Sequence, residues 1–164
     1  MFPDDIADLA TDVIAAATAR GWTVATAESC TGGLVAGALT AVPGSSAVVD
    51  RGFVTYSNAA KTALLGVPET LLDSHGAVSE PVARAMAEGA RSRADVDLAV
   101  SITGVAGPGG GSPEKPLGLV HFACAGAAGT VHARHDFGDL GREGVRLAAV
   151  RVALTMLVEA CEAG

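Results

Sequence analysis

The stretch WTVATAESCTGGLVAGALTA, residues 22–41, decides the fold class of this chain. Its first part, 22–27, is apolar and β-branched and predicts a strand, whereas 34–41 is apolar and predicts a short helix. The polar segment 26–33 lies at the junction, so we expect a strand-to-helix turn. In α/β proteins such turns bind ligands, because the free backbone N–H groups at the start of the new helix favour anions.

The rest of the chain continues to alternate between strand and helix patterns. Apolar residues at helical spacing predict a first helix over Asp4 to Arg20, which Gly21 ends. The run 96–103 contains no turn residue, so we expect it to be a central strand, and the glycine-rich segment 104–116 predicts a loop. Further strands are expected over 48–57, 117–125 and 130–137, and further helices over 68–74, 79–93 and 142–160.

This order predicts an α/β fold, with one domain over residues 1–164 built as three α/β/α layers. The sheet should have about five strands. It must be mixed, because 117–125 and 130–137 read as an antiparallel hairpin, whereas strands joined through helices pair in parallel. A chain of 164 residues is long enough to bury roughly two-thirds of its unfolded surface.

The composition argues against several classes of function. With 49% hydrophobic and 18% charged residues the chain is not disordered, and no apolar run approaches the roughly 18 residues that span a bilayer. The net charge of −7 argues against binding to nucleic acid, which needs clustered cations. The start of the chain is acidic, unlike a signal peptide, and the three cysteines show no metal-ligand pattern. We therefore expect a cytoplasmic protein that binds no metal.

Lysine is rare in this chain, which has nine arginines but only Lys61 and Lys115. Arginine stays protonated, whereas a buried lysine can lose its proton and act as a base. Asn58 is expected to cap the helix that carries Lys61, which would place this lysine on the first turn. A lysine kept in an arginine-biased chain is therefore a candidate catalytic base.

Polar side chains gather near the predicted strand ends and point to nucleophilic catalysis. If the strands 22–27 and 96–103 run parallel, Ser29 and Thr103 reach the same edge of the sheet. No histidine is obviously placed to act as a base, so Ser29 activated by a desolvated Lys61 is the sharper hypothesis. The N–H groups of residues 30–33 could then hold a developing oxyanion.

The same residues also have plain structural interpretations. Ser29 could be only a helix cap, Tyr56 a surface strand residue and Lys61 a solvated first-turn lysine. Cys30 is expected to be a small buried side chain rather than a nucleophile. A turn rich in serine, threonine and glycine is also typical of a site that only binds phosphate.

Several motifs in the same order resemble the CinA carboxy-terminal domain family over nearly the whole chain. They are AESCTGG (27–33), GSS (44–46), RGFVTYSN (51–58) with Lys61, GAVSEPV (76–82), and SITGVAGP (101–108) closing on EKPLG (114–118). The family comprises nicotinamide mononucleotide deamidases, called PncC when they stand alone, and this chain resembles the stand-alone form.

The resemblance implies that the carboxamide of nicotinamide mononucleotide is hydrolysed to the acid and ammonia, without a metal or cofactor. Ser29 would be the nucleophile and Lys61 its base, with Tyr56 completing the hydrogen-bonded group. The other matching positions are expected to bind the substrate: Thr31, Gly32, Gly33, Ser46, Thr103 and Gly104, with Arg142 as a phosphate ligand. Ser46 stays open as an alternative nucleophile. We also expect a homodimer.

Two other functions fit the same motifs. One is a catalytically silent nucleotide-binding module, and the other is a deamidase of a different amide. The loop Gly107–Ser112 departs from the family pattern by an extra glycine in place of an acidic or polar residue, which leaves the role of the loop open.

Overall fold

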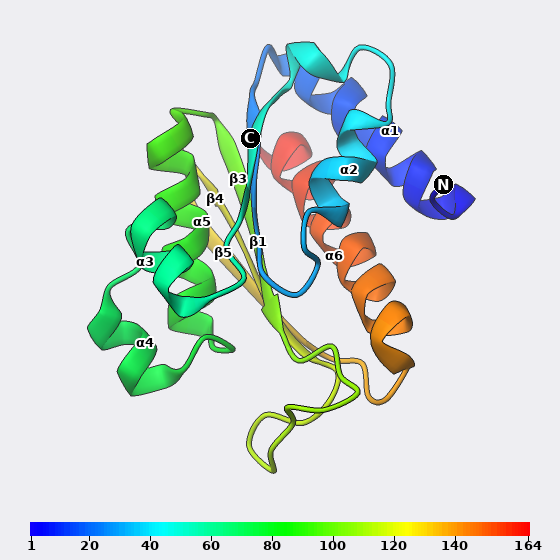
Figure 1. The fold of residues 1–164 in the computed structure, drawn as a ribbon. Coiled ribbons are helices and arrows are strands. Elements are labelled where there is room, and N and C mark those ends of the chain that lie inside the picture. The colour runs from blue at the N-terminus through cyan, green and yellow to red at the C-terminus, as the bar shows by residue number, and fades with distance from the viewer.

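The computed structural model describes residues 1–164 as a five-stranded sheet between two groups of helices (Figure 1). The strand order is β2-β1-β3-β4-β5. The helices and strands are α1 (Asp4–Arg20), β1 (Val24–Glu28), α2 (Leu34–Thr40), the 3-10 helix η1 (Ser45–Ala47), β2 (Val49–Val54), α3 (Asn58–Leu65), α4 (Glu69–His75), α5 (Glu80–Ala94), β3 (Leu98–Gly104), β4 (Leu119–Gly126), β5 (Gly129–Asp136) and α6 (Gly141–Ala163).

Both faces of the sheet are covered, which gives three layers. On one face α5 packs against the strands, with α3 and α4 packed on α5. On the other face α2 and α6 pack against the sheet, and α1 packs on both of them. The buried apolar residues form a larger cluster around α1 and α6, a smaller one under α5, and a group of four alanines between α5 and β4. The predicted α/β/α arrangement with a mixed sheet is confirmed.

The strand directions bring distant segments to one edge of the sheet. β1 pairs in parallel with β2 and β3, whereas β3–β4 and β4–β5 are antiparallel. Glu28 at the end of β1 therefore lies beside Val54 on one side and Ile102 on the other. The turn after β1, the segment after β2 and the loop after β3 consequently meet at this edge.

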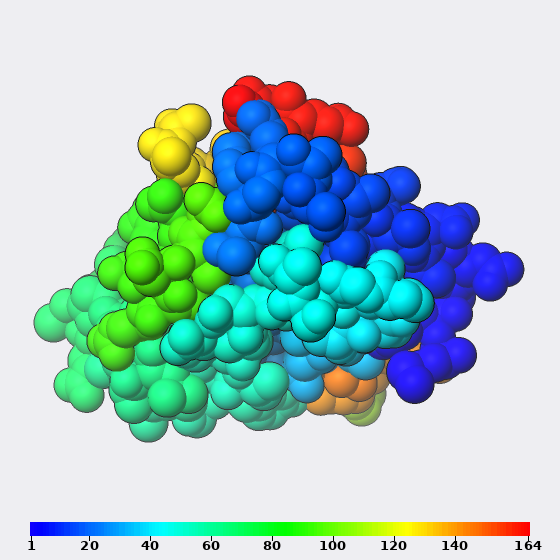
Figure 2. Space-filling model, turned by 90° about the horizontal axis from the view of Figure 1, so that it is seen from above, coloured from blue at the N-terminus to red at the C-terminus, as the bar shows by residue number.

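Figure 2 shows the opposite end of the molecule, where the strands β1 and β3 begin. The segment after α1, the connection from α2 to β2, the hairpin turn and the end of α6 gather there, with α3 to α5 on one side and α1 and α2 on the other. None of the helices combines the length and the apolar character needed to cross a membrane.

Most predicted elements form where the sequence places them. The helix Asp4–Arg20 is confirmed, β3 is the middle strand, and the predicted hairpin is formed by β4 and β5. The expectation that Asn58 caps α3 is wrong. The cap is Ser57, whose Oγ accepts a hydrogen bond from the N–H of Ala60. α6 is apolar on more than one side, because it lies between the sheet and α1.

Candidate active site

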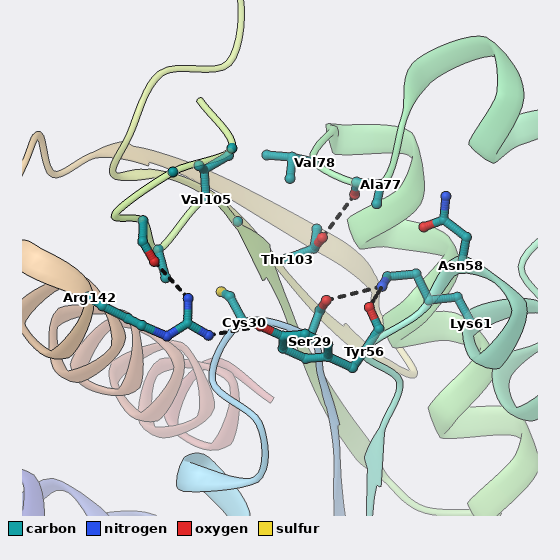
Figure 3. A pocket seen from close by; sticks show the side chains of 15 residues that line it. Ser29, Cys30, Tyr56, Asn58, Lys61, Ala77, Val78, Thr103, Val105 and Arg142 are labelled. Atoms are coloured by element: carbon teal, nitrogen blue, oxygen red, sulfur yellow. Dashed lines mark hydrogen bonds between the residues drawn. The ribbon is translucent and has the colours of Figure 1, made fainter. Parts of the chain in front are cut away.

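A cavity of about 310 Å³ opens at the carboxyl ends of β1, β2 and β3 (Figure 3). Five segments enclose it: the β1–α2 turn, the β2–α3 segment, the α4–α5 connection, the glycine-rich loop after β3, and the start of α6. Its lining residues are Ser29, Cys30, Tyr56, Asn58, Lys61, Ala77, Val78, Thr103, Gly104, Val105, Ala106, Gly107, Gly109, Gly110 and Arg142. Most of these segments are loops or helix starts carried on a rigid sheet, the usual setting for a site in an α/β protein.

Ser29 and Lys61 form a hydrogen-bonded pair in this cavity. The Nζ of Lys61 lies 3.0 Å from the Oγ of Ser29, and the lysine side chain is only 1% exposed. Burial lowers the pKa of the Lys61 amine from its ordinary value, because a charged amine loses its hydration there. Lys61 is therefore buried, and the alternative interpretation of it as a solvated lysine on the helix surface is wrong.

The other contacts of Lys61 suit a neutral amine. Its Nζ donates to the carbonyl oxygens of Thr55, at 2.8 Å, and of Tyr56, at 3.4 Å. A neutral amine has two hydrogens and one lone pair. With both hydrogens on these carbonyls, the lone pair is left for the hydroxyl of Ser29. Thr55 is itself held at the edge of the sheet, since its backbone N–H, in the peptide unit before this carbonyl, donates to the backbone oxygen of Glu28.

The turn that carries Ser29 is organised by Glu28. The Glu28 carboxylate is fully buried and accepts hydrogen bonds from the backbone N–H groups of Gly33, Val35 and Ala36 at 2.9–3.2 Å. The hydroxyl of Thr26 donates a fourth bond. The start of α2 is therefore already occupied by an anion from the protein itself.

This arrangement corrects the expected oxyanion site. The N–H of Gly33 is bonded to Glu28 and that of Gly32 to the carbonyl of Ser29, so neither is free to bind a substrate. Neither glycine lines the cavity, and neither does the buried Thr31. Within the predicted segment, only the N–H groups of Cys30 and Thr31 have no partner in the chain.

Arg146 of α6 holds this turn from the outside. Its Nε donates to the carbonyl oxygen of Cys30 at 3.1 Å and its Nη2 to that of Thr31 at 3.3 Å. Because the C=O and N–H of one peptide unit point in opposite directions, fixing the Cys30 carbonyl towards α6 turns the Thr31 N–H away from α6. The thiol of Cys30 is buried, which raises its pKa to about 11, so it is an inert neighbour rather than a nucleophile.

The remaining predicted site residues are divided between the cavity and the opposite edge of the sheet. Thr103 and Gly104 line the cavity, and the Thr103 hydroxyl donates to the carbonyl of Ala77 at 2.9 Å. Ser46 is exposed in η1, before the amino end of β2, so it lies at the opposite edge from Lys61. Of the two serines that the sequence left open, Ser29 is the one within reach of the amine.

Tyr56 and Arg142 both line the cavity, but Tyr56 does not join Ser29 and Lys61 through its hydroxyl. That hydroxyl accepts a hydrogen bond from the Nη2 of Arg142 at 2.8 Å, while the Nη1 of Arg142 donates to the carbonyl of Gly107 at 2.7 Å. Figure 3 shows Lys61 and Arg142 reaching the cavity from opposite sides. The Tyr56 side chain is 61% exposed.

Sequence reasoning missed part of the cavity wall. Asn58, Ala77 and Val78 line it, and the role of Glu28 as the anchor of the turn was not predicted. A signal was present for Asn58, which directly follows Tyr56 and Ser57 in a polar segment at a strand end. Ala77 and Val78 belong to the motif GAVSEPV (76–82), but the motif did not place them at the cavity, because the α4–α5 connection reaches it only through tertiary packing.

A family model described as the CinA C-terminal domain matches residues 6–161 of the chain. The chain belongs to the CinA C-terminal domain family. The crystal structure of a family protein described as competence/damage inducible protein CihA, from Agrobacterium tumefaciens, has a TM-score of 0.96 and 55% identity, covering 99% of this chain and 98% of that one. A CinA-superfamily protein from Klebsiella pneumoniae has a TM-score of 0.92 and 40% identity, covering 97% and 99%.

Relatives in the CinA family differ in length and in name. A protein named nicotinamide-nucleotide amidohydrolase PncC, from Enterobacter agglomerans, is 56% identical over 144 residues, which is 87% of each chain. A protein from Anaeromyxobacter dehalogenans named only CinA-like is 57% identical over 155 residues, covering 94% of this chain but 37% of that protein. The chain thus spans little more than a third of such CinA-like relatives.

Proposed function

We propose that this chain is an amidohydrolase that converts nicotinamide mononucleotide to nicotinate mononucleotide and ammonia. The observation that carries the reaction class is the Ser29–Lys61 pair, a hydroxyl 3.0 Å from a buried amine, in a cavity lined by no histidine or carboxylate. The choice of substrate is supported by the similarity to the Enterobacter agglomerans protein, which bears that activity in its name.

The first half of the reaction forms an acyl-enzyme. Neutral Lys61 accepts the hydroxyl proton while the Oγ of Ser29 attacks the carboxamide carbon. The carbonyl oxygen becomes an oxyanion, for which the turn offers the two N–H groups that have no partner in the chain, those of Cys30 and Thr31. The tetrahedral intermediate then expels the nitrogen, which takes the proton from Lys61 and leaves as ammonia.

The second half releases the acid. A water molecule attacks the ester carbon and gives its proton to Lys61, and the C–Oγ bond breaks as that proton returns to Ser29. The product is a carboxylic acid, which ionises at neutral pH. Each proton that Lys61 accepts is returned within the same half-reaction, so a neutral amine is needed at the start of both.

Ammonia release from nicotinamide mononucleotide tests this proposal directly. Ser29→Ala and Lys61→Met should each lower kcat by at least about 10³-fold, as expected when one member of a nucleophile–base pair is removed. Ser46→Ala is the matched control and should keep wild-type turnover, because Ser46 is exposed at the far edge of the sheet. Full turnover in Ser29→Ala would exclude the assigned roles.

The same assay separates the two other functions. Binding of nicotinamide mononucleotide without ammonia release at high protein concentration would favour a silent nucleotide-binding module. Faster ammonia release from another amide in a panel would favour a deamidase with a different substrate. A homodimer is part of the proposal, and light scattering in solution tests it.

A further inference from the structure

The turn that carries Ser29 has nearly all of its backbone N–H groups paired within the protein. From Ser29 to Ala36 these groups donate to backbone carbonyls or to the carboxylate of Glu28. Only the N–H groups of Cys30 and Thr31 have no partner in the chain, although both residues are buried. A buried N–H without a partner costs free energy, so these two groups mark a place where a ligand atom can accept.

The carbonyl groups of the same turn point to Arg146 of α6. Its Nε donates to the carbonyl oxygen of Cys30 at 3.1 Å, and its Nη2 donates to that of Thr31 at 3.3 Å. These donors belong to one edge of a planar guanidinium group, so they hold two consecutive carbonyls in a fixed relation. The guanidinium also packs on Gly32, where a Cβ would lie 3.4 Å from Nη2. A cation therefore holds the carbonyl side of the turn, while Glu28 holds its N–H side.

The contact with Arg146 acts on the Thr31 N–H through a single peptide unit. The Cys30 carbonyl and the Thr31 N–H belong to the same planar unit and point in opposite directions. A donor on the carbonyl oxygen polarises this unit and makes the N–H at its other end a stronger donor. The polarisation is larger when the donor is a cation, because charge-assisted hydrogen bonds are stronger than neutral ones. Arg146 therefore sets both the direction and the donor strength of one of the two unpaired N–H groups.

Arg146 can reach the reacting groups only through this turn. Its side chain does not line the cavity, and no ion pair in the chain involves it, so no carboxylate neutralises its charge. The charge does act on the turn. Burial raises the pKa of the Cys30 thiol, and Arg146 is among the groups that act in the opposite direction. A negative charge that develops beside this turn in a transition state is stabilised by the same cation.

We propose that Arg146 is a positioning residue, which orients and polarises the Thr31 N–H for the oxyanion that forms when Ser29 attacks the carboxamide. The carbonyl oxygen of the bound substrate carries little charge, so the stabilisation arises mainly in the transition state. Loss of Arg146 should therefore lower kcat and leave KM nearly unchanged. The assignment rests on the proposed function, because the attack by Ser29 creates the oxyanion.

The kinetics of Arg146 variants with nicotinamide mononucleotide test this role. Removing an oxyanion donor outright costs about 10²- to 10³-fold in kcat. Arg146→Met keeps the N–H but loosens its peptide and removes the charge, so we expect kcat to fall roughly 10- to 100-fold while KM changes by less than about threefold. Arg146→Lys keeps the charge but cannot hold both carbonyls, so it should recover part of the lost kcat and stay below the wild type.

Arg151→Met is the matched control, because Arg151 lies on the same helix but pairs with Asp5. It should keep the kcat and KM of the wild type. Unchanged kcat in Arg146→Met, or a rise in KM that accounts for the whole loss of kcat/KM, would overturn the proposal. Thermal unfolding of each variant shows whether it folds. If Arg146→Met does not fold, Arg146→Lys decides the outcome, and wild-type kcat in that protein overturns the positioning role.

A boronic acid measures the stabilisation of the oxyanion without amide hydrolysis. When pyridine-3-boronic acid binds, the Oγ of Ser29 forms a bond to boron and the hydroxyl proton passes to Lys61. The adduct is a tetrahedral boronate whose negative charge takes the place of the oxyanion. Its Kd should rise in Arg146→Met by about the same factor by which kcat falls, and should not change in Arg151→Met. Equal Kd values for the wild type and Arg146→Met would overturn the proposal.

The two measurements also separate the positioning role from the proposed function. If the wild type releases no ammonia but binds the boronic acid, and Arg146→Met binds it more weakly, the positioning role stands and the proposed deamidase function fails. If ammonia is released and neither kcat nor the Kd depends on Arg146, the deamidase function stands and the positioning role fails. A wild-type protein that neither releases ammonia nor binds the boronic acid contradicts both.

Discussion

Replacing Glu28 with glutamine should destabilise the protein far more than the loss of one charge on a surface. The substitution keeps the size of the side chain and changes an acceptor oxygen into an NH₂ donor. With its remaining oxygen on Gly33 and Val35, the glutamine would point its NH₂ at the N–H of Ala36 and the hydroxyl of Thr26. The hydroxyl can rotate to accept, but the N–H of Ala36 cannot.

The expected magnitude comes from these contacts. One buried N–H loses a charge-assisted bond, and the start of α2 loses its anion, which together amount to about 2–4 kcal/mol. For a chain of this length, 1 kcal/mol shifts Tm by about 2–4 °C. A decrease in Tm of roughly 5–15 °C is therefore expected.

Urea unfolding followed by circular dichroism measures this free energy at neutral pH. The matched control is Glu159→Gln, since Glu159 is exposed on α6 and has no side-chain hydrogen bond, so its change should stay within about 0.5 kcal/mol. A Glu28→Gln protein as stable as the control would refute the view that this carboxylate holds the turn of Ser29.

Three further predictions concern titration and packing. The rate of ammonia release should rise with pH as Lys61 loses its proton, with an apparent pKa below 10.5, because burial lowers the pKa of Lys61 and the neutral amine is the base. The Lys61→Arg protein should be inactive at every pH, because arginine stays protonated. Burial lowers the pKa of His121 to about 4 from 6.5. Between pH 6.5 and 4 the unfolded chain therefore binds more protons than the folded one. In urea unfolding, the free energy of unfolding should fall by up to about 3 kcal/mol as the pH is lowered from 6.5 to 4, and this fall should be smaller in the His121→Gln protein. Gly89→Ala should destabilise by about 1–3 kcal/mol in thermal unfolding, because its Cβ would lie 2.0 Å from the carbonyl oxygen of Leu65. Gly37→Ala, with only an ordinary contact at 3.5 Å, should be neutral or slightly stabilising.

Patterns within a short window predicted most of the fold. The helical spacing of Asp4–Arg20, the uninterrupted run of β3 and the hairpin of β4 and β5 are local signals, and all three elements form where expected. The family motifs pointed to Ser29 and Lys61, which the structure brings together. These signals are readable because hydrophobic periodicity reports which face of an element is buried.

The hydrogen-bond partners of the polar groups at the site could not be predicted from the sequence, because they depend on the tertiary arrangement. Tyr56 was grouped with Ser29 and Lys61, and its carbonyl oxygen does accept from Lys61, but its hydroxyl bonds Arg142, 86 positions away. The N–H groups of Gly32 and Gly33 were expected to be free, but local bonds within the turn and to Glu28 use them. Both errors come from assigning a polar group to a ligand before its partners in the protein are known.

The place of β1 between β2 and β3 has a consequence for the order in which the molecule assembles. β1 precedes both neighbours in the sequence, and 74 positions separate its first residue, Val24, from Leu98 at the start of β3. During synthesis β1 can pair both of its edges only after β3 has been made, and contacts between such distant segments form slowly. Ser29 gains its anchor on β3 only at that stage, because its N–H bonds the carbonyl of Ile102. A nascent chain that ends before Leu98 lacks this anchor, so labelling of Ser29 by a serine-directed reagent would report the closing step of folding.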